Sequence, residues 1–145
     1  MRLTRSVSYA VAILLRVHAQ GNDGPMTAAE ISRGCDFPPR FLYRVLRRLV
    51  DAGLMTGTSG PGGGYSLALP ARQINLLSVV DAVDGGVEPP ALETVNTKHR
   101  RAVAAVNELG DRNCERFRRD LAKMSIARLD AVSRVPTKKR AARRA

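Results

Sequence analysis

Four side chains able to donate hydrogen bonds recur at helical spacing: Arg40, Tyr43, Arg44 and Arg47. At 100° per residue they share one face of a helix, and no acidic residue follows them until Asp51. A guanidinium matches the O6 and N7 atoms of guanine, whereas an acid on the same face would repel phosphates. The pattern indicates a surface that reads a polyanion such as duplex DNA. The alternative interpretation is an ordinary solvated helical face.

The opposite face of the same segment is apolar and gives the helix a side to bury. We expect a helix from Pro39 to about Ala52, ended by Gly53. Its buried residues would be Leu42, Val45, Leu46 and Leu49. A short helix from Ala28 to about residue 34 should precede it, because Thr27 and Glu30 have the spacing of a capping box.

The first helix follows from an apolar repeat at helical spacing, with Thr4 or Ser6 as its cap and a turn at 21–25. The residues that carry this repeat are Tyr9, Ala10, Ile13, Leu14 and Val17. Arg2 and Arg5 lie at its N-terminus, where backbone amides favour phosphate oxygens. For Thr4, a plain capping role is the alternative to a phosphate contact.

A β-hairpin is predicted after the basic helix, with strands at 54–58 and 65–69 around a glycine-rich tip at 59–64. Glycines at the tip leave room for close approach to a phosphate or a groove. A nucleotide-binding loop is excluded because no Gly-Lys-Ser/Thr follows. A hairpin that is merely flexible stays open as an alternative. A fourth helix should begin after Asn75, with Leu77, Val80 and Val83 buried.

This order of elements is typical of a winged helix-turn-helix, so we predict a mainly α fold with a small β-hairpin wing (α+β). The DNA-binding domain would span residues 1–85, followed by a loop at 86–97. A helical dimerisation region would span 98–132, with one helix at 99–109 that Gly110 kinks or breaks and another at 113–124. Residues 133–145 would form a disordered basic tail.

Composition excludes several other classes of protein. The chain has 145 residues and a net charge of +11, and its last ten residues carry five basic and no acidic side chains. No apolar run reaches the roughly 18 residues that span a bilayer, and polar residues interrupt the N-terminus too often for a signal peptide. Two cysteines make no disulfide framework. We expect a cytoplasmic protein without membrane contact. Because no catalytic constellation survives a spacing test, we also expect no enzyme.

Three segments together resemble the Rrf-type (Rrf2) winged helix-turn-helix transcriptional regulators of bacteria. They are the N-terminus at 1–10, the junction at 49–54 and the Gly-Pro-Gly-Gly-Gly-Tyr wing at 60–65. The stretch at 74–85 and, more weakly, that at 121–129 also match. The resemblance covers about residues 1–132, and the wing sequence is its most specific signal.

The resemblance implies a homodimeric, sequence-specific repressor that binds a palindromic operator in double-stranded DNA. The resemblance and the residue patterns together predict these DNA-binding residues: Arg2, Thr4, Arg5, Pro39, Arg40, Tyr43, Arg44, Arg47, Ser59, Gly60 and Gly62. Its expected dimerisation set is Val103, Val106, Phe117, Leu121 and Met124. Many family members have an arginine at the position of Ser59 that enters the minor groove, so this chain departs from the pattern there.

A second departure concerns iron. Cluster-binding members of the family carry three cysteines and often a histidine at positions that here read Leu92, Lys98, Ala104 and Asn107. None of these side chains holds iron in a cluster, so we expect no metal and no cofactor.

The two cysteines leave one question of regulation open. Cys35 lies near Arg33 and Arg40, which would lower the pKa of a thiol, so a redox-sensing regulator using Cys35 is an alternative. The simpler interpretation of Cys35 and Cys114 is that both are small buried residues. The sequence does not indicate an effector.

An adaptor that uses a winged helix as a protein-interaction scaffold is the alternative function. It would bind nucleic acid only nonspecifically, through its basic tail. A regulator should prefer its site over random DNA by roughly 10³-fold or more, whereas an adaptor would not.

Overall fold

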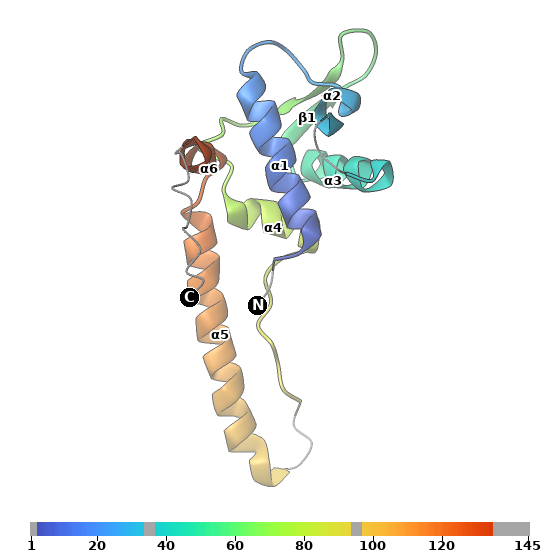
Figure 1. Cartoon of the computed structure of the whole chain (residues 1–145). Coiled ribbons are helices and arrows are strands. Elements are labelled where there is room, and N and C mark those ends of the chain that lie inside the picture. Colours follow the sequence, from blue (N-terminus) through green and yellow to red (C-terminus); the bar gives the residue numbers. More distant parts are fainter. Residues whose placement is uncertain (1–2, 34–36, 94–96, 135–145) are drawn as a thin grey trace, which may run out of the picture.

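The computed structural model describes residues 3–33, 37–93 and 97–134 (Figure 1). Its elements are α1 (Arg5–Gln20), α2 (Ala28–Ser32), α3 (Pro39–Asp51), β1 (Met55–Thr58), β2 (Gly64–Leu67), α4 (Leu76–Asp84), the 3₁₀ helix η1 (Thr97–His99), α5 (Arg100–Ala122) and α6 (Ile126–Ser133). The predicted fold class, mainly helical with one small hairpin, is confirmed.

A single hydrophobic core holds α1, α3 and α4 together. From α3 it takes the four residues expected from the apolar repeat, Leu42, Val45, Leu46 and Leu49, none more than 4% exposed. Burying such a side chain contributes about 1.5–3 kcal/mol, so this face fixes how α3 rotates about its axis. The core also includes Leu121 at the end of α5 and Ile126 at the start of α6.

The capping box at the start of α2 is confirmed. The Thr27 backbone N–H donates to the Glu30 carboxylate at 2.8 Å, and the Glu30 N–H donates to the Thr27 hydroxyl at 3.2 Å. The Thr27 backbone N–H and then its hydroxyl hold the pKa of the Glu30 carboxyl below its ordinary value. Because this pKa is lowered, the stabilisation is present above the ordinary pKa of Glu and is lost as the pH falls through the lowered value.

The hairpin is antiparallel, with Met55 opposite Leu67 and Thr58 opposite Gly64. An isolated β-bridge joins the hairpin to the segment before α2, because Met26 and Tyr65 exchange two backbone hydrogen bonds of 2.9 and 2.7 Å. The hairpin therefore has three points of support: its own register, this bridge and the burial of Met55.

The fourth helix is confirmed, but its buried face differs by one residue from the prediction. Val79, Val80 and Val83 are buried, and Leu77 is only half-buried. The Asn75 side chain caps the helix by accepting from the Ser78 N–H at 3.0 Å.

The predicted break at Gly110 is wrong, because α5 is one continuous helix of 23 residues. A glycine inside a helix costs about 1 kcal/mol relative to alanine, so its presence calls for a packing reason. The structure supplies one: a Cβ on Gly110 would lie 3.1 Å from the Pro90 carbonyl oxygen. The glycine thus makes room for the segment 87–93 to run along the helix, as Figure 1 shows.

Backbone pairing anchors the turn between α5 and α6 to the start of α4. The Leu76 N–H donates to the Met124 carbonyl and the Ile126 N–H donates to the Ile74 carbonyl, each at 2.8 Å. The rest of α5 extends away from the helices around α1 (Figure 1). Among the described residues, no helix is long and apolar enough to span a bilayer.

Gly64 should be a sensitive glycine of the wing, because it combines a positive φ with a backbone close by. Its φ is +144°, and a Cβ there would lie 2.5 Å from the Met26 carbonyl oxygen. We expect Gly64→Ala to lower the free energy of unfolding by roughly 1–3 kcal/mol, measured by urea denaturation. Gly57→Ala is the matched control, because a Cβ at Gly57 meets the Tyr65 ring only at ordinary contact distances. Equal effects of the two substitutions would contradict this assignment.

Candidate nucleic-acid interface

The outward face of α3 carries the side chains that the sequence singles out. Arg40, Tyr43, Arg44 and Arg47 are all exposed, Tyr43 to 57% of its surface, while the apolar face of the same helix lies in the core. Pro39 opens the helix as its first residue. The first acid on the helix, Asp51, is its last residue. The predicted separation of a basic and an apolar face is therefore present.

The helix and the wing border one groove of about 460 Å³. From α3 it is lined by Tyr43, Arg47 and Val50. From the hairpin it is lined by Gly57, Thr58, Ser59, Gly64 and Tyr65. The helix α3 and the hairpin are neighbours in the sequence. In the structure, the predicted residues Tyr43, Arg47 and Ser59 line one common surface.

An aromatic cluster supports the N-terminal half of α3. The Tyr9 ring of α1 meets the Phe37 ring edge-on at 4.6 Å between centroids and the Phe41 ring at 6.1 Å. Phe41 remains 41% exposed, and the guanidinium carbon of Arg44 lies 5.6 Å from the centre of its ring. Sequence reasoning missed Phe41, which belongs to neither the buried apolar stripe nor the polar one. An aromatic three residues before an arginine is the signal that would have found it.

The arginines at the C-terminal half of α3 have different partners. Arg47 pairs with Asp51 at 3.8 Å, and its side chain stays 84% exposed. Arg48 donates to the backbone carbonyl of Val83 in the last turn of α4. Carbonyls at a helix C-terminus lack intrahelical partners, so a guanidinium satisfies one of them and also matches the helix dipole. Arg48 therefore fastens α3 to α4, a structural role that sequence reasoning missed.

The start of α1 differs from the prediction. Thr4 occupies the N-cap position, but its hydroxyl makes no cap hydrogen bond and donates to the Asp84 carboxylate at 2.7 Å. An acid at this place disfavours a nearby phosphate, so Thr4 is a weaker candidate for a DNA contact than expected. Arg5 is exposed, and Arg2 lies outside the described residues.

One face of α5 packs against the segment 87–93 and the core of the same chain. The stripe consists of half-buried or buried residues spaced by three or four: Val103, Asn107, Gly110, Cys114, Phe117 and Leu121. The Asn107 carboxamide accepts from the Leu92 N–H at 2.8 Å and donates to the Leu92 carbonyl at 3.1 Å. Further along, the Cys114 thiol donates to the Val87 carbonyl at 3.2 Å.

A second face of α5 is apolar and exposed. It contains Val106 and Leu109, which are 49% and 51% exposed, with Ala102 beside them. Of the predicted dimerisation set, only Val106 lies on this face. Val103 is half-buried on the covered stripe, Met124 is half-buried, and Phe117 and Leu121 pack in or against the chain's own core. Leu109, which is also on this face, was not in the predicted set.

The positions that the family resemblance assigns to cluster ligands show no ligand set here. Leu92 and Asn107 meet through the amide hydrogen bonds described above, and Ala104 is an exposed aliphatic residue. Across the residues that the structure describes, no group of three His, Cys, Asp or Glu side chains could hold a metal ion. These residues do not fit an iron–sulfur cluster. Cys35, the proposed redox residue, lies outside the described ranges, and Cys114 is buried.

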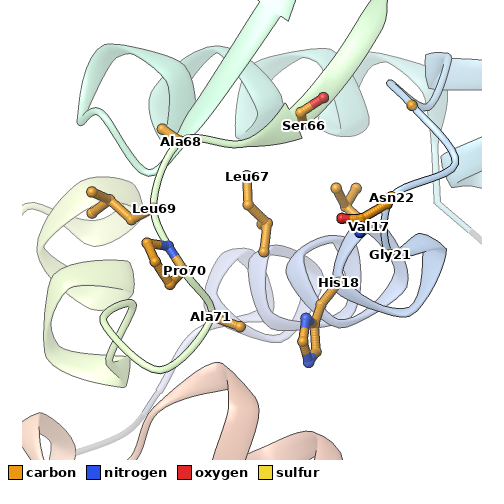
Figure 2. Close-up of a pocket in the computed structure, with 11 residues that line it drawn as sticks. Val17, His18, Gly21, Asn22, Ser66, Leu67, Ala68, Leu69, Pro70 and Ala71 are labelled. Carbon is orange, nitrogen blue, oxygen red and sulfur yellow. The ribbon is translucent and has the colours of Figure 1, made fainter.

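A larger hollow of about 670 Å³ lies between the end of α1 and the segment 66–71 (Figure 2), and none of its described lining residues belongs to α3. Among the described residues that line it, His18 is the one with a titratable side chain. It faces Asp130 of α6 at 3.9 Å, and Asp130 is held by Arg134 at 2.9 Å. A single imidazole beside an occupied carboxylate gives this hollow no acid–base pair for catalysis.

A basic helix that is docked by its apolar face and followed by a glycine-rich hairpin defines a winged helix-turn-helix. Residues 3–131 match the Rrf2 family model, described as an iron-dependent transcriptional regulator, and the chain belongs to that family.

Relatives of known name agree with this family. The chain is 40% identical over 88 residues to the HTH-type transcriptional regulator IscR of Photobacterium profundum, over 61% of this chain and 51% of the relative. It is 39% identical over 88 residues to IscR of Yersinia enterocolitica, over 61% of this chain and 54% of the relative. The chain thus spans about half the length of the curated relatives it matches. These relatives are regulators rather than enzymes.

Solved structures share the fold at low sequence identity. The global cysteine regulator CymR (YrzC) of B. subtilis superposes with a TM-score of 0.66 at 18% identity, over 91% of this chain and 98% of that one. IscR of T. potens gives a TM-score of 0.64 at 16% identity, over 92% of this chain and 88% of that one. The winged-helix fold class is confirmed.

Proposed function

We propose that this chain is a sequence-specific DNA-binding repressor that reads a palindromic operator as a homodimer, without an iron–sulfur cluster. The observation that carries the proposal is the groove shared by α3 and the wing, next to an outward helical face without acids before Asp51. The apolar stripe of α3 lies in the core, so the basic face can enter a major groove, which is wide enough for one helix.

The wing would contact the DNA backbone beside the site that α3 reads. Its tip carries glycines with positive φ, among them Gly60 and Gly62, and a Cβ at either would meet open space. Such a tip lets backbone amides approach phosphates closely. Ser59 is short and uncharged, so base reading would rest on α3 and the wing would mainly position the domain.

Selection of bound sequences from a random DNA pool tests the function directly. A repressor should enrich one palindromic sequence and bind it roughly 10³-fold or more tightly than random DNA at the same salt concentration. An adaptor with nonspecific affinity would enrich no sequence, and this result would overturn the proposal.

Arg44→Ala should relax the choice of base at one position of each half-site. Loss of a bidentate guanine contact is expected to cost about 1–3 kcal/mol on the selected sequence and little on random DNA. Competition binding measures both values. Arg112→Ala is the matched control, since Arg112 pairs with Glu108 on α5 and should not alter either value. Equal losses on all sequences would reassign Arg44 to a phosphate contact.

The proposed dimer would form through the exposed apolar face of α5. Val106 and Leu109 are about half exposed. Most of α5 extends away from the helices around α1 (Figure 1), and this exposed apolar face supports a second copy as the partner. A charge at the centre of such an interface is uncompensated and strongly unfavourable. We therefore expect Val106→Glu to weaken self-association at least about tenfold, measured by analytical ultracentrifugation.

Glu108→Lys is the control for this variant, because residue 108 points about 200° away from residue 106 around the helix. It should leave self-association unchanged. If Val106→Glu remains as dimeric as the parent chain, the interface lies elsewhere.

The absence of a cluster is part of the proposal, and the Asn107 side chain supports it. Its two hydrogen bonds to the Leu92 backbone join two of the four positions that the family resemblance assigns to cluster ligands, so amide hydrogen bonds connect the segment 87–93 to α5 there. We expect protein prepared without oxygen to be colourless and to contain no stoichiometric iron or sulfide. Iron and acid-labile sulfide in stoichiometric amounts would refute this part of the proposal.

A further inference from the structure

We propose that Phe41 is a positioning residue for base recognition: its ring holds the Arg44 guanidinium in place before DNA arrives. This inference rests on the proposed function and deepens it. It concerns which arginine of α3 distinguishes bases and why.

The geometry around Arg44 differs from that around its neighbour on the helix. The Arg44 guanidinium carbon lies 5.6 Å from the centre of the Phe41 ring, within the range of a cation–π contact. A ring contact of this kind occupies no N–H group, so the guanidinium keeps its donors for a bidentate partner. Arg47 instead has Asp51 at 3.8 Å and must exchange that carboxylate for any new acceptor.

The ring that holds Arg44 is itself supported from the core. Phe41 and Phe37 both meet the Tyr9 ring edge-on, and Tyr9 packs against the core from α1. Edge-to-face pairs of this kind restrict ring orientation. A chain of contacts thus runs from α1 through Phe41 to an arginine on the outward face. Arginine loses much rotamer freedom on binding, so restricting it in advance lowers the cost of recognition.

Phe41→Leu is the informative variant, because it keeps an apolar side chain of similar size and removes only the ring. Affinity for the selected operator should fall about two- to fivefold, with no change on random DNA. The effect should disappear in an Arg44→Ala background, because the ring then has no guanidinium to hold. Phe41→Tyr keeps the ring and should restore operator affinity.

Phe37→Leu is the matched control: Phe37 shares the contact with Tyr9, and no cation–π contact joins it to Arg44. It should leave the preference for operator over random DNA unchanged. If Phe41→Leu binds like the parent chain, or loses as much affinity in the Arg44→Ala background, the positioning role is wrong.

A measurement on the free protein separates this inference from the proposed function. The Arg44 δ-protons should show an upfield ring-current shift in the NMR spectrum, and Phe41→Leu should abolish it in a chain that remains folded. A missing shift in the parent chain would overturn the inference even if the operator is bound tightly. A chain that shows the shift but selects no DNA sequence would overturn the proposed function and the recognition role of Phe41 with it.

Discussion

The structure depends on the fact that α3 can bury only one of its faces. Leu42, Val45, Leu46 and Leu49 fill the space between α1 and α4, and each is worth more inside the core than any single polar contact is worth outside it. Their burial fixes the rotation of the helix. The face with Arg44 must then look outward, beside a hairpin that the Met26–Tyr65 bridge holds in place. One apolar stripe therefore determines where every candidate base-reading group can lie.

Three arginines within five residues of the same helix show how packing gives one residue type different tasks. Arg44 rests on an aromatic ring, Arg47 pairs with the helix's own terminal acid, and Arg48 donates to an unpaired carbonyl at the end of α4. All three side chains are guanidinium cations, so they carry the same charge. What distinguishes them is which acceptors lie within reach, and this follows from the placement of α1 and α4.

The long helix α5 shows a similar division between two faces. Its covered stripe is occupied by the chain's own segment 87–93, through the Asn107 amide, the space left by Gly110 and the Cys114 thiol. Its exposed apolar face carries Val106 and Leu109. The family model is described as iron-dependent, but in this chain an amide side chain, Asn107, connects the segment 87–93 to α5.

The sequence by itself determined the elements and their local faces. Apolar periodicity gave α1, α3 and α4, the Thr27–Glu30 spacing gave the capping box, and the glycine-rich tip gave the hairpin, since each depends on residues close together in the chain. Only the tertiary structure decided what lies beside each face. Gly110 looked like a helix break because the contact that favours a glycine there, a close approach of the Pro90 carbonyl, involves a residue 20 positions away in the sequence. Thr4 looked like a cap because its actual acceptor, Asp84, follows 80 residues later. Leu121 looked like a dimer-interface residue because the core residues that bury it lie on other helices, far away in the sequence. Local spacing determines which side chains share a face, whereas contacts between distant segments determine what that face meets.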